Sequence, residues 1–153
     1  MKISASRNAG GALAVAAVLL AVASVGCSQT QHATFQPSGP PLDLASAEQL
    51  ARSTPLGAVA GVETSTAPVL RSQALAYLRT RGPVATRAAD LLTAGFPQRT
   101  LSVPVLVRAC RVNDHDAILV VEAWGGGDPT LDRRRLWVFD RLTGTVIAAA
   151  AFR

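Results

Sequence analysis

The chain has 153 residues and a formal net charge of +5, and 49% of its residues are hydrophobic, against 16% charged and 5% aromatic. This composition excludes a disordered polyelectrolyte, a coiled coil and a collagen-like rod, and the length suits one domain. Two cysteines are too few for a disulfide scaffold or for a zinc site built from cysteine alone.

Residues 1–26 are predicted to form an export signal. Lys2 and Arg7 are the only charged residues before Asp43, and residues 9–25 are an apolar run rich in alanine, valine and leucine. A positively charged start, an apolar run and then small residues form the layout of a secretory signal peptide. Because the run is close to the shortest length that spans a bilayer, an uncleaved transmembrane anchor is the alternative.

The apolar run ends in Ser24-Val25-Gly26-Cys27. Small residues directly before a cysteine at this place resemble the lipobox of bacterial lipoproteins, although that family usually has leucine where Ser24 stands. The resemblance implies that Cys27 receives a diacylglyceryl group and that cleavage precedes it. Two or more acyl chains anchor a protein stably. We therefore expect a lipid-anchored protein on the extracytoplasmic face of the cell membrane, with the membrane as a partner and no nucleic acid.

Residues 27–44 are predicted to be the lipidated cysteine and a flexible linker. The segment 28–41 carries no charge and few apolar side chains, and its prolines and glycine interrupt regular structure. Such a segment lifts a domain off the membrane. His32 lies within it and is predicted to have no chemical role. The remaining residues, 45–153, are predicted to form a single domain.

Helices are expected first in this domain. The spacing of apolar residues predicts a helix over 42–53. A second helix is predicted from Pro68, which suits a first helical position, with Arg71 off its apolar face. Gly82-Pro83 interrupts the next apolar stretch, so that a helical hairpin and one kinked helix are both open.

Strands are expected in the second half, because the apolar period changes from about 3.6 to 2 after Pro97. The first predicted strand covers 101–109, and Pro104 within it indicates an edge position or a bulge. Three more strands are predicted over 117–124, 135–140 and 146–152. Helices followed by strands predict an α+β fold, with N-terminal helices packed on one face of a four-stranded antiparallel β-meander.

The apolar positions also predict the core. The sheet face beneath the helices is expected to consist of Val105, Val107, Ile118, Val120, Leu136 and Val138. The helical residues expected opposite them are Leu70, Leu78 and Leu91. A register error of one residue would place the side chains of any of these strands on the opposite face of the sheet.

The sharpest charge feature is the run Arg133-Arg134-Arg135. In an extended strand Arg133 and Arg135 share one face and Arg134 points away. With Arg108 and Arg141 from the same sheet region, they are candidates for contact with an anionic group on a lipid, an envelope polymer or an envelope protein. The favoured interpretation is surface pairing with nearby carboxylates, namely Glu122, Asp128, Asp132 and Asp140, at about 0–1 kcal/mol for each pair.

Catalytic motifs are weak in this sequence. Cys110 is predicted to be a small buried hydrophobe, and a nucleophilic pair of Cys110 with His115 is the alternative. The turn at 113–116 holds potential metal ligands, but the same residue types favour tight turns, and no cofactor or metal is predicted. The glycine-rich loop at 125–129 lacks the lysine of a phosphate-binding loop and is the candidate contact loop.

These observations predict a membrane-anchored envelope lipoprotein whose small domain binds a partner and is not an enzyme. One alternative is an envelope hydrolase with its site near His115, and another is a purely structural envelope component. One histidine, one free cysteine and no serine-nucleophile motif in the domain argue against the hydrolase.

Overall fold

The computed structural model describes residues 32–95 and 101–153. The predicted signal peptide, Cys27 and the linker up to residue 31 lie outside the described residues. The elements, in chain order, are β1 (Thr34–Gln36), α1 (Leu44–Ser53), the 3₁₀ turns η1 (Gly57–Val59) and η2 (Thr64–Thr66), α2 (Ala67–Arg79), α3 (Pro83–Gly95), β2 (Ser102–Val112), β3 (His115–Trp124), β4 (Arg133–Asp140) and β5 (Val146–Phe152). None of the helices in this described part has the length and apolar character needed to cross a bilayer.

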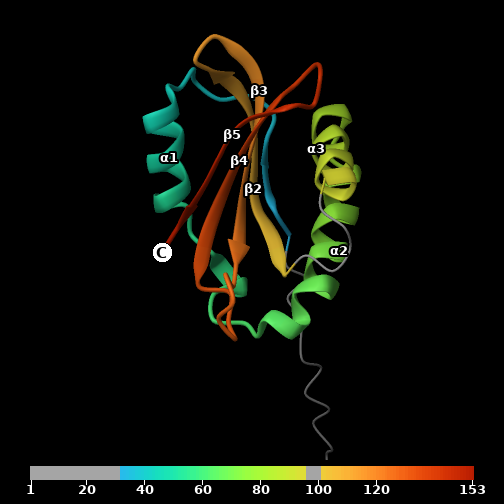
Figure 1. Cartoon of the computed structure of the whole chain (residues 1–153). Helices are drawn as coiled ribbons and strands as arrows, with labels where there is room; N and C mark the ends of the chain where they lie inside the picture. The colour runs from blue at the N-terminus through green and yellow to red at the C-terminus, as the bar shows by residue number, and fades with distance from the viewer. Residues whose placement is uncertain (1–31, 96–100) are drawn as a thin grey trace, which may run out of the picture.

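The strands form one mixed sheet with the order β1-β2-β3-β4-β5 (Figure 1). β2 to β5 are an antiparallel meander, which confirms the α+β class and the four predicted strands. β1 adds a fifth strand, parallel to β2, in which Phe35 is opposite Val107. This strand lies inside the segment predicted as linker, 27–44, and Ala33 before it is only 1% exposed. The folded part of the chain therefore includes Ala33, and three residues are too short to show a strand period.

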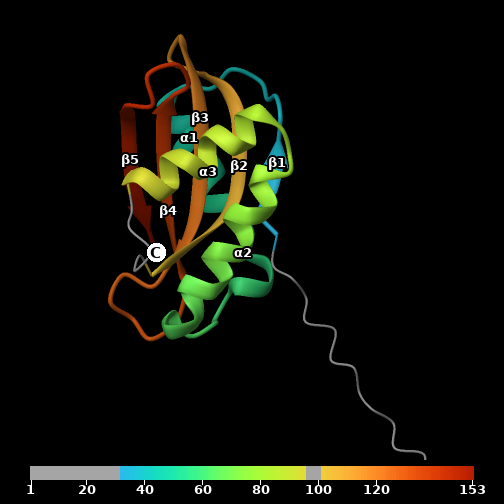
Figure 2. The ribbon, with the colours of Figure 1, turned by 90° about the vertical axis from the view of Figure 1, so that its right-hand side faces the viewer.

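The helices cover both faces of the sheet, whereas one covered face was predicted. Figures 1 and 2 show α1 on one face, here called the α1 face, and α2 with α3 on the other, the α2–α3 face. Adjacent residues of β4 show the same division. Arg134 donates from Nε to the carbonyl oxygen of Thr54, at the end of α1, over 2.8 Å. Arg135 lies on the opposite face, with Glu122.

The six sheet residues predicted as core are all buried, but they do not share one face. The register pairs Val120 with Val107 on one side and with Trp137 on the other. Because successive side chains alternate, Val107 and Val120 lie on the α2–α3 face, whereas Leu136 and Val138 lie on the α1 face. The single-face prediction is therefore wrong, since it placed β4 one residue out of phase with β3.

The turns and the bulge follow the local sequence signals. The register of β2 shifts between Pro104 and Leu106, which confirms a bulge at the proline. β2 is not an edge strand, because β1 pairs with it. Asn113 and Asp114 have φ values of 45° and 70° and form the two-residue turn between β2 and β3. Gly144, with φ of 78°, closes the hairpin between β4 and β5 as predicted.

Candidate functional site

A charged network lies buried between the sheet and helices α2 and α3. Its centre is Glu122 in β3, whose side chain is 0% exposed. Arg71 of α2 donates from Nη1 to Oε1 of this carboxylate, and Arg135 of β4 donates from Nη2 to Oε2 over 2.8 Å. Trp137 donates from Nε1 to the same Oε2 over 2.9 Å. Both oxygens of the carboxylate are thus occupied by donors from other elements.

Ser102 at the start of β2 completes this network. Its Oγ accepts from Nη1 of Arg71 at 3.1 Å and from Nη2 of Arg135 at 3.0 Å. Nη2 of Arg71 donates to the carbonyl oxygen of Leu92 in α3 over 3.1 Å. Within the described residues, no buried side-chain nitrogen or oxygen lacks a hydrogen-bond partner. The network therefore connects two helices to three strands.

The electrostatics of the network favour an ionised carboxylate. Burial raises the pKa of Glu122, but the charges and hydrogen bonds of Arg71 and Arg135 lower it by more, so the pKa lies below its ordinary value. Cζ of Arg135 lies 5.2 Å from the ring centroid of Trp124 and 5.0 Å from that of Trp137, which adds cation–π attraction. A buried carboxylate held this way is suited to orienting the helices on the sheet, not to proton transfer.

Sequence reasoning missed this network. Arg71 was predicted to lie off the buried face of its helix, but its side chain is only 3% exposed. A signal was present in the sequence, because Glu122 is the one charged residue in the apolar stretch of β3 from Ala117 to Trp124. A carboxylate in a strand that is apolar on both faces requires a buried cation, since an unpaired buried charge is very costly.

The structure does not bring the four arginines of the predicted anion site together. Arg133 and Arg135 share a face of β4, as predicted, because they pair with Trp124 and Glu122. Arg108 pairs with Leu119 and so lies on the α1 face. Arg141 follows the other end of β4, about 27 Å along the strand from Arg133.

Three of these four arginines also have partners within the domain. Arg133 donates to Asp128 in the glycine-rich loop, with Nη2 and Oδ2 2.6 Å apart. Arg135 binds Glu122, and Arg108 donates from Nε to the side-chain oxygen of Gln36 in β1. Arg133 therefore forms the kind of pair that the surface interpretation describes, whereas Arg135 belongs to the buried network; the anion contact itself stays a prediction.

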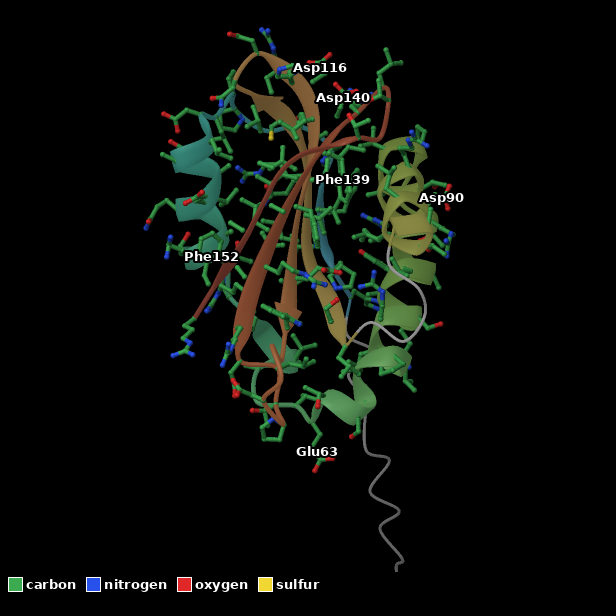
Figure 3. The ribbon with its side chains drawn as sticks, in the orientation of Figure 1. Glu63, Asp90, Asp116, Phe139, Asp140 and Phe152 are labelled. Carbon is green, nitrogen blue, oxygen red and sulfur yellow. The ribbon has the colours of Figure 1, made fainter. Side chains whose placement is uncertain are left out.

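His115 is the first residue of β3, directly after the turn at 113–114, and it is exposed. Asp116 and Asp140 lie together at the end of the molecule opposite Glu63 (Figure 3), where the backbone N–H of Arg141 donates to the carbonyl oxygen of Asp116 over 2.8 Å. Across the described ranges, 32–95 and 101–153, no group of histidine, cysteine and acidic residues has an arrangement that could hold a metal ion. The predicted turn thus forms, as an open and solvated end of the sheet.

Cys110 is half-buried in β2. Burial raises the pKa of its thiol, and the charge of Arg108 lowers it by less. A raised pKa keeps the sulfur in the thiol form, which is a poor nucleophile. The structure therefore agrees with a packing role for Cys110 better than with a nucleophilic one.

An open cleft of about 340 Å³ lies between β1, the bulge of β2 and the end of α1. Its lining includes His32, Thr34, Gln36, Leu50, Thr54 and Leu106. No carboxylate, arginine or cysteine contributes to this lining. The cleft is thus weakly polar and lies beside His32, the first described residue.

Comparison with known proteins found no matching family model, no matching curated protein and no matching solved structure. Function must therefore be argued from the residues of this chain. They offer a predicted lipidation motif before the described part, the cleft at β1 and the sheet edge at β5.

Proposed function

We propose that this protein is an envelope lipoprotein, anchored to the membrane through lipid on Cys27, whose folded domain binds a partner and does not catalyse a reaction. The motif Ser24-Val25-Gly26-Cys27 supports the anchor. The observation that carries the proposal is the short stretch of chain between Cys27 and Ala33, the first buried residue. These six residues span at most about 20–22 Å, so a lipid on Cys27 would keep the domain next to the bilayer.

The direction of β1 supports an orientation on the membrane. β1 runs parallel to β2, toward the end of the sheet that carries the turn at 113–114. Ala33, which precedes β1, therefore lies toward the opposite end of the sheet, where the loop between β3 and β4 lies (Figure 1). An anchored domain would present its hairpin turns and its sheet edges to partners in the envelope.

Three features support binding over catalysis. Glu122, whose pKa is perturbed, is saturated by its arginine partners and closed to solvent. His115 and its acidic neighbours Asp116 and Asp140 line a wide, open hollow of about 530 Å³, which does not enclose a substrate. The cleft at β1 has one titratable side chain in its lining, that of His32, and no carboxylate, arginine or thiol beside it. Enzymes instead combine an enclosed pocket with titratable groups that face into it.

Metabolic labelling tests the anchor. Full-length protein expressed in a bacterial host with an alkyne fatty acid should incorporate the label and sediment with membranes. Cys27→Ser should abolish both, and Cys110→Ser, the matched control, should retain both. Mass spectrometry of the mature N-terminus should find Cys27 first. An intact Met1, or label on the Cys27→Ser variant, would contradict the proposal.

A further inference from the structure

β5 is an unpaired edge of the sheet. In the order β1-β2-β3-β4-β5 it has one strand neighbour, β4, among the described residues, and Figure 2 shows it along the margin of the sheet. Alternate residues of an edge strand direct their N–H and C=O groups away from the neighbouring strand. About half of the seven residues of β5 therefore offer backbone donors and acceptors outward.

β5 also lacks the usual protection of an edge strand. Its sequence is Val146-Ile147, four alanines and Phe152, without a charge or a proline. Val146 and Ile147 are exposed. The opposite edge, β1, has three residues and is followed by Pro37, which is a typical way to prevent edge pairing. Only the β5 edge is thus long and apolar enough for an added strand.

We propose that β5 docks an extended segment of a partner protein, which pairs with it as an additional strand. The segment has small or apolar side chains along its length and acidic residues at the end that meets Phe152. This inference rests on the proposed binding role of the domain and names the kind of partner. Main-chain hydrogen bonds provide affinity in this mode of recognition, and side chains provide specificity.

The acidic end is inferred from the charges around Phe152 (Figure 3). Cζ of Arg52 lies 4.1 Å above the Phe152 ring, and Arg134 is the cross-strand partner of Phe152. Arg133, on the opposite face of β4 from Arg134, and Arg153 line a small hollow that Phe152 also borders. The carboxylates at these arginines are Glu48, 3.7 Å from Arg52, and Asp128, paired with Arg133. Four arginine side chains thus meet two carboxylate side chains here, and an acidic strand end is complementary to them.

A second copy of this chain fits the edge less well. Antiparallel pairing of two β5 strands would place the Phe152 end of one copy against the Val146 end of the other. Arg87 lies near the Val146 end, where its Nη2 approaches Gly144 closely, so its positive charge would face the arginines around Phe152 across the pair. The two-fold axis that relates the two copies would also be perpendicular to the joined sheet. The lipid anchors of the two copies would then lie at opposite ends of the dimer.

Synthetic peptides of about the length of β5 test the proposal. Fluorescence anisotropy would measure the binding of each peptide to the detergent-solubilised full-length chain. The first peptide alternates valine and threonine and carries two glutamates at its N-terminus, and the second carries them at its C-terminus. Two further peptides have lysines in place of the glutamates. One glutamate peptide should bind at least about tenfold more tightly than its lysine counterpart, a difference of about 1.4 kcal/mol. A central proline in the peptide should abolish binding.

Variants of the chain locate the binding surface. The N–H groups of Ala149 and Ala150 point in opposite directions, one toward β4 and one outward. Of the two variants Ala149→Pro and Ala150→Pro, one therefore removes the outward donor and leaves the pairing with β4 intact. The variant that retains the wild-type melting temperature should bind at least about tenfold more weakly. Arg153→Glu leaves the strand unchanged and should remove the preference for glutamate, even where both proline variants unfold. Arg81→Glu, an exposed arginine just beyond α2, is the matched control and should bind as wild type.

The outcomes separate this inference from the proposed anchor. Cys27→Ser should release the protein from membranes and still bind the glutamate peptide. Equal binding of glutamate and lysine peptides, or full binding by a folded proline variant, would overturn the inference. A dimer in sedimentation that both proline variants abolish would overturn the choice of occupant, in favour of a second copy of the chain.

Discussion

The two faces of the sheet bury their side chains by different means. On the α1 face the central positions are apolar, as at Leu119, Val121, Leu136 and Val138. On the α2–α3 face the apolar Val107 and Val120 stand beside the ionised Glu122 and its two arginines. Both faces exclude water, but only one of them does so with groups that require specific partners.

This difference shows what each kind of packing specifies. Apolar contacts stabilise burial without strong directional preference, so the central positions of the α1 face require complementary shape and no particular polar partner. The guanidinium of Arg71 must reach Glu122, Ser102 and the Leu92 carbonyl at once. A fully satisfied buried network therefore restricts the placement of α2 and α3 on the sheet, and removing one member leaves the others uncompensated.

Glu122→Leu should give the largest loss of stability. The substitution leaves Arg71 and Arg135 buried without their carboxylate, and breaking a buried ion pair in this way costs about 3–5 kcal/mol. Urea denaturation followed by circular dichroism measures the free energy of unfolding. A loss under about 1 kcal/mol would show that the arginines find other partners or water, against a specific network.

The triple variant Arg71→Met, Glu122→Leu, Arg135→Met is the control for that experiment. Replacing a whole buried network by apolar residues of similar volume is often neutral or stabilising. Most of the stability lost in the single variant should therefore return. A triple variant as unstable as Glu122→Leu would show that volume, not unpaired charge, caused the loss.

Leu136→Ala tests the apolar face. Leu136 is fully buried, and deleting its branch removes apolar contacts and leaves a cavity, which costs about 2–5 kcal/mol. The same denaturation experiment at neutral and at acidic pH should give a similar loss, because no charge is involved. A loss below about 1 kcal/mol would mean that neighbouring residues on the α1 face move in and fill the cavity.

Acid should weaken the α2–α3 face selectively. The pKa of Glu122 is lower in the folded protein than in the unfolded chain, so its contribution to stability is present above the unfolded pKa and is lost as pH falls through the folded pKa. Glutamine resembles the protonated side chain. The difference in unfolding free energy between wild type and Glu122→Gln should therefore shrink as pH falls below the ordinary range of glutamate.

Exposed carboxylates provide the background for this pH experiment. The pKa of Asp43 is lowered by its hydrogen bonds with Ser46, and that of Asp140 mainly by its hydrogen bonds with Thr143. Both residues lose stabilising interactions in acid in wild type and in Glu122→Gln alike, so they cancel in the comparison. A difference that stays constant with pH would contradict an ionised Glu122.

Much of the fold followed from periodicity and turn chemistry. The change of apolar period separated helices from strands, and Asn113, Asp114 and Gly144 identified the two hairpin turns. β1 could not be predicted, since its three residues carry no period and Pro37 follows directly. The assignment of side chains to sheet faces failed at β3, because Ala117 to Val121 are all apolar. In such a strand the sequence does not show which residues face which helix.

The candidate site was less predictable, because charge alone does not show where a side chain points. Alternation correctly separated Arg134 from its neighbours, but the sequence does not tell which carboxylate lies opposite each arginine. The register decides this by placing Glu122 against Arg135 and Trp124 against Arg133. The openness of β5 also depends on strand order, which only the complete sheet shows.

Arg133→Gln should have the smallest effect, and it sharpens the comparison within one face. Arg133 and Arg135 lie two residues apart on the same strand and face. The side chain of Arg133 is 23% exposed and its partner Asp128 is 48% exposed, whereas Arg135 binds a carboxylate that is 0% exposed. An exposed pair contributes about 0–1 kcal/mol, and a hydrogen bond to a buried charge about 1.5–3 kcal/mol.

Urea denaturation of Arg133→Gln and Arg135→Gln at low and high salt measures both contributions. The small loss in Arg133→Gln should vanish at high salt, because mobile ions screen exposed charges. The larger loss in Arg135→Gln should persist, because the ions cannot enter the interior. Equal losses with equal salt dependence would place both arginines at the surface, and the α2–α3 face would then owe its stability to apolar packing, like the α1 face.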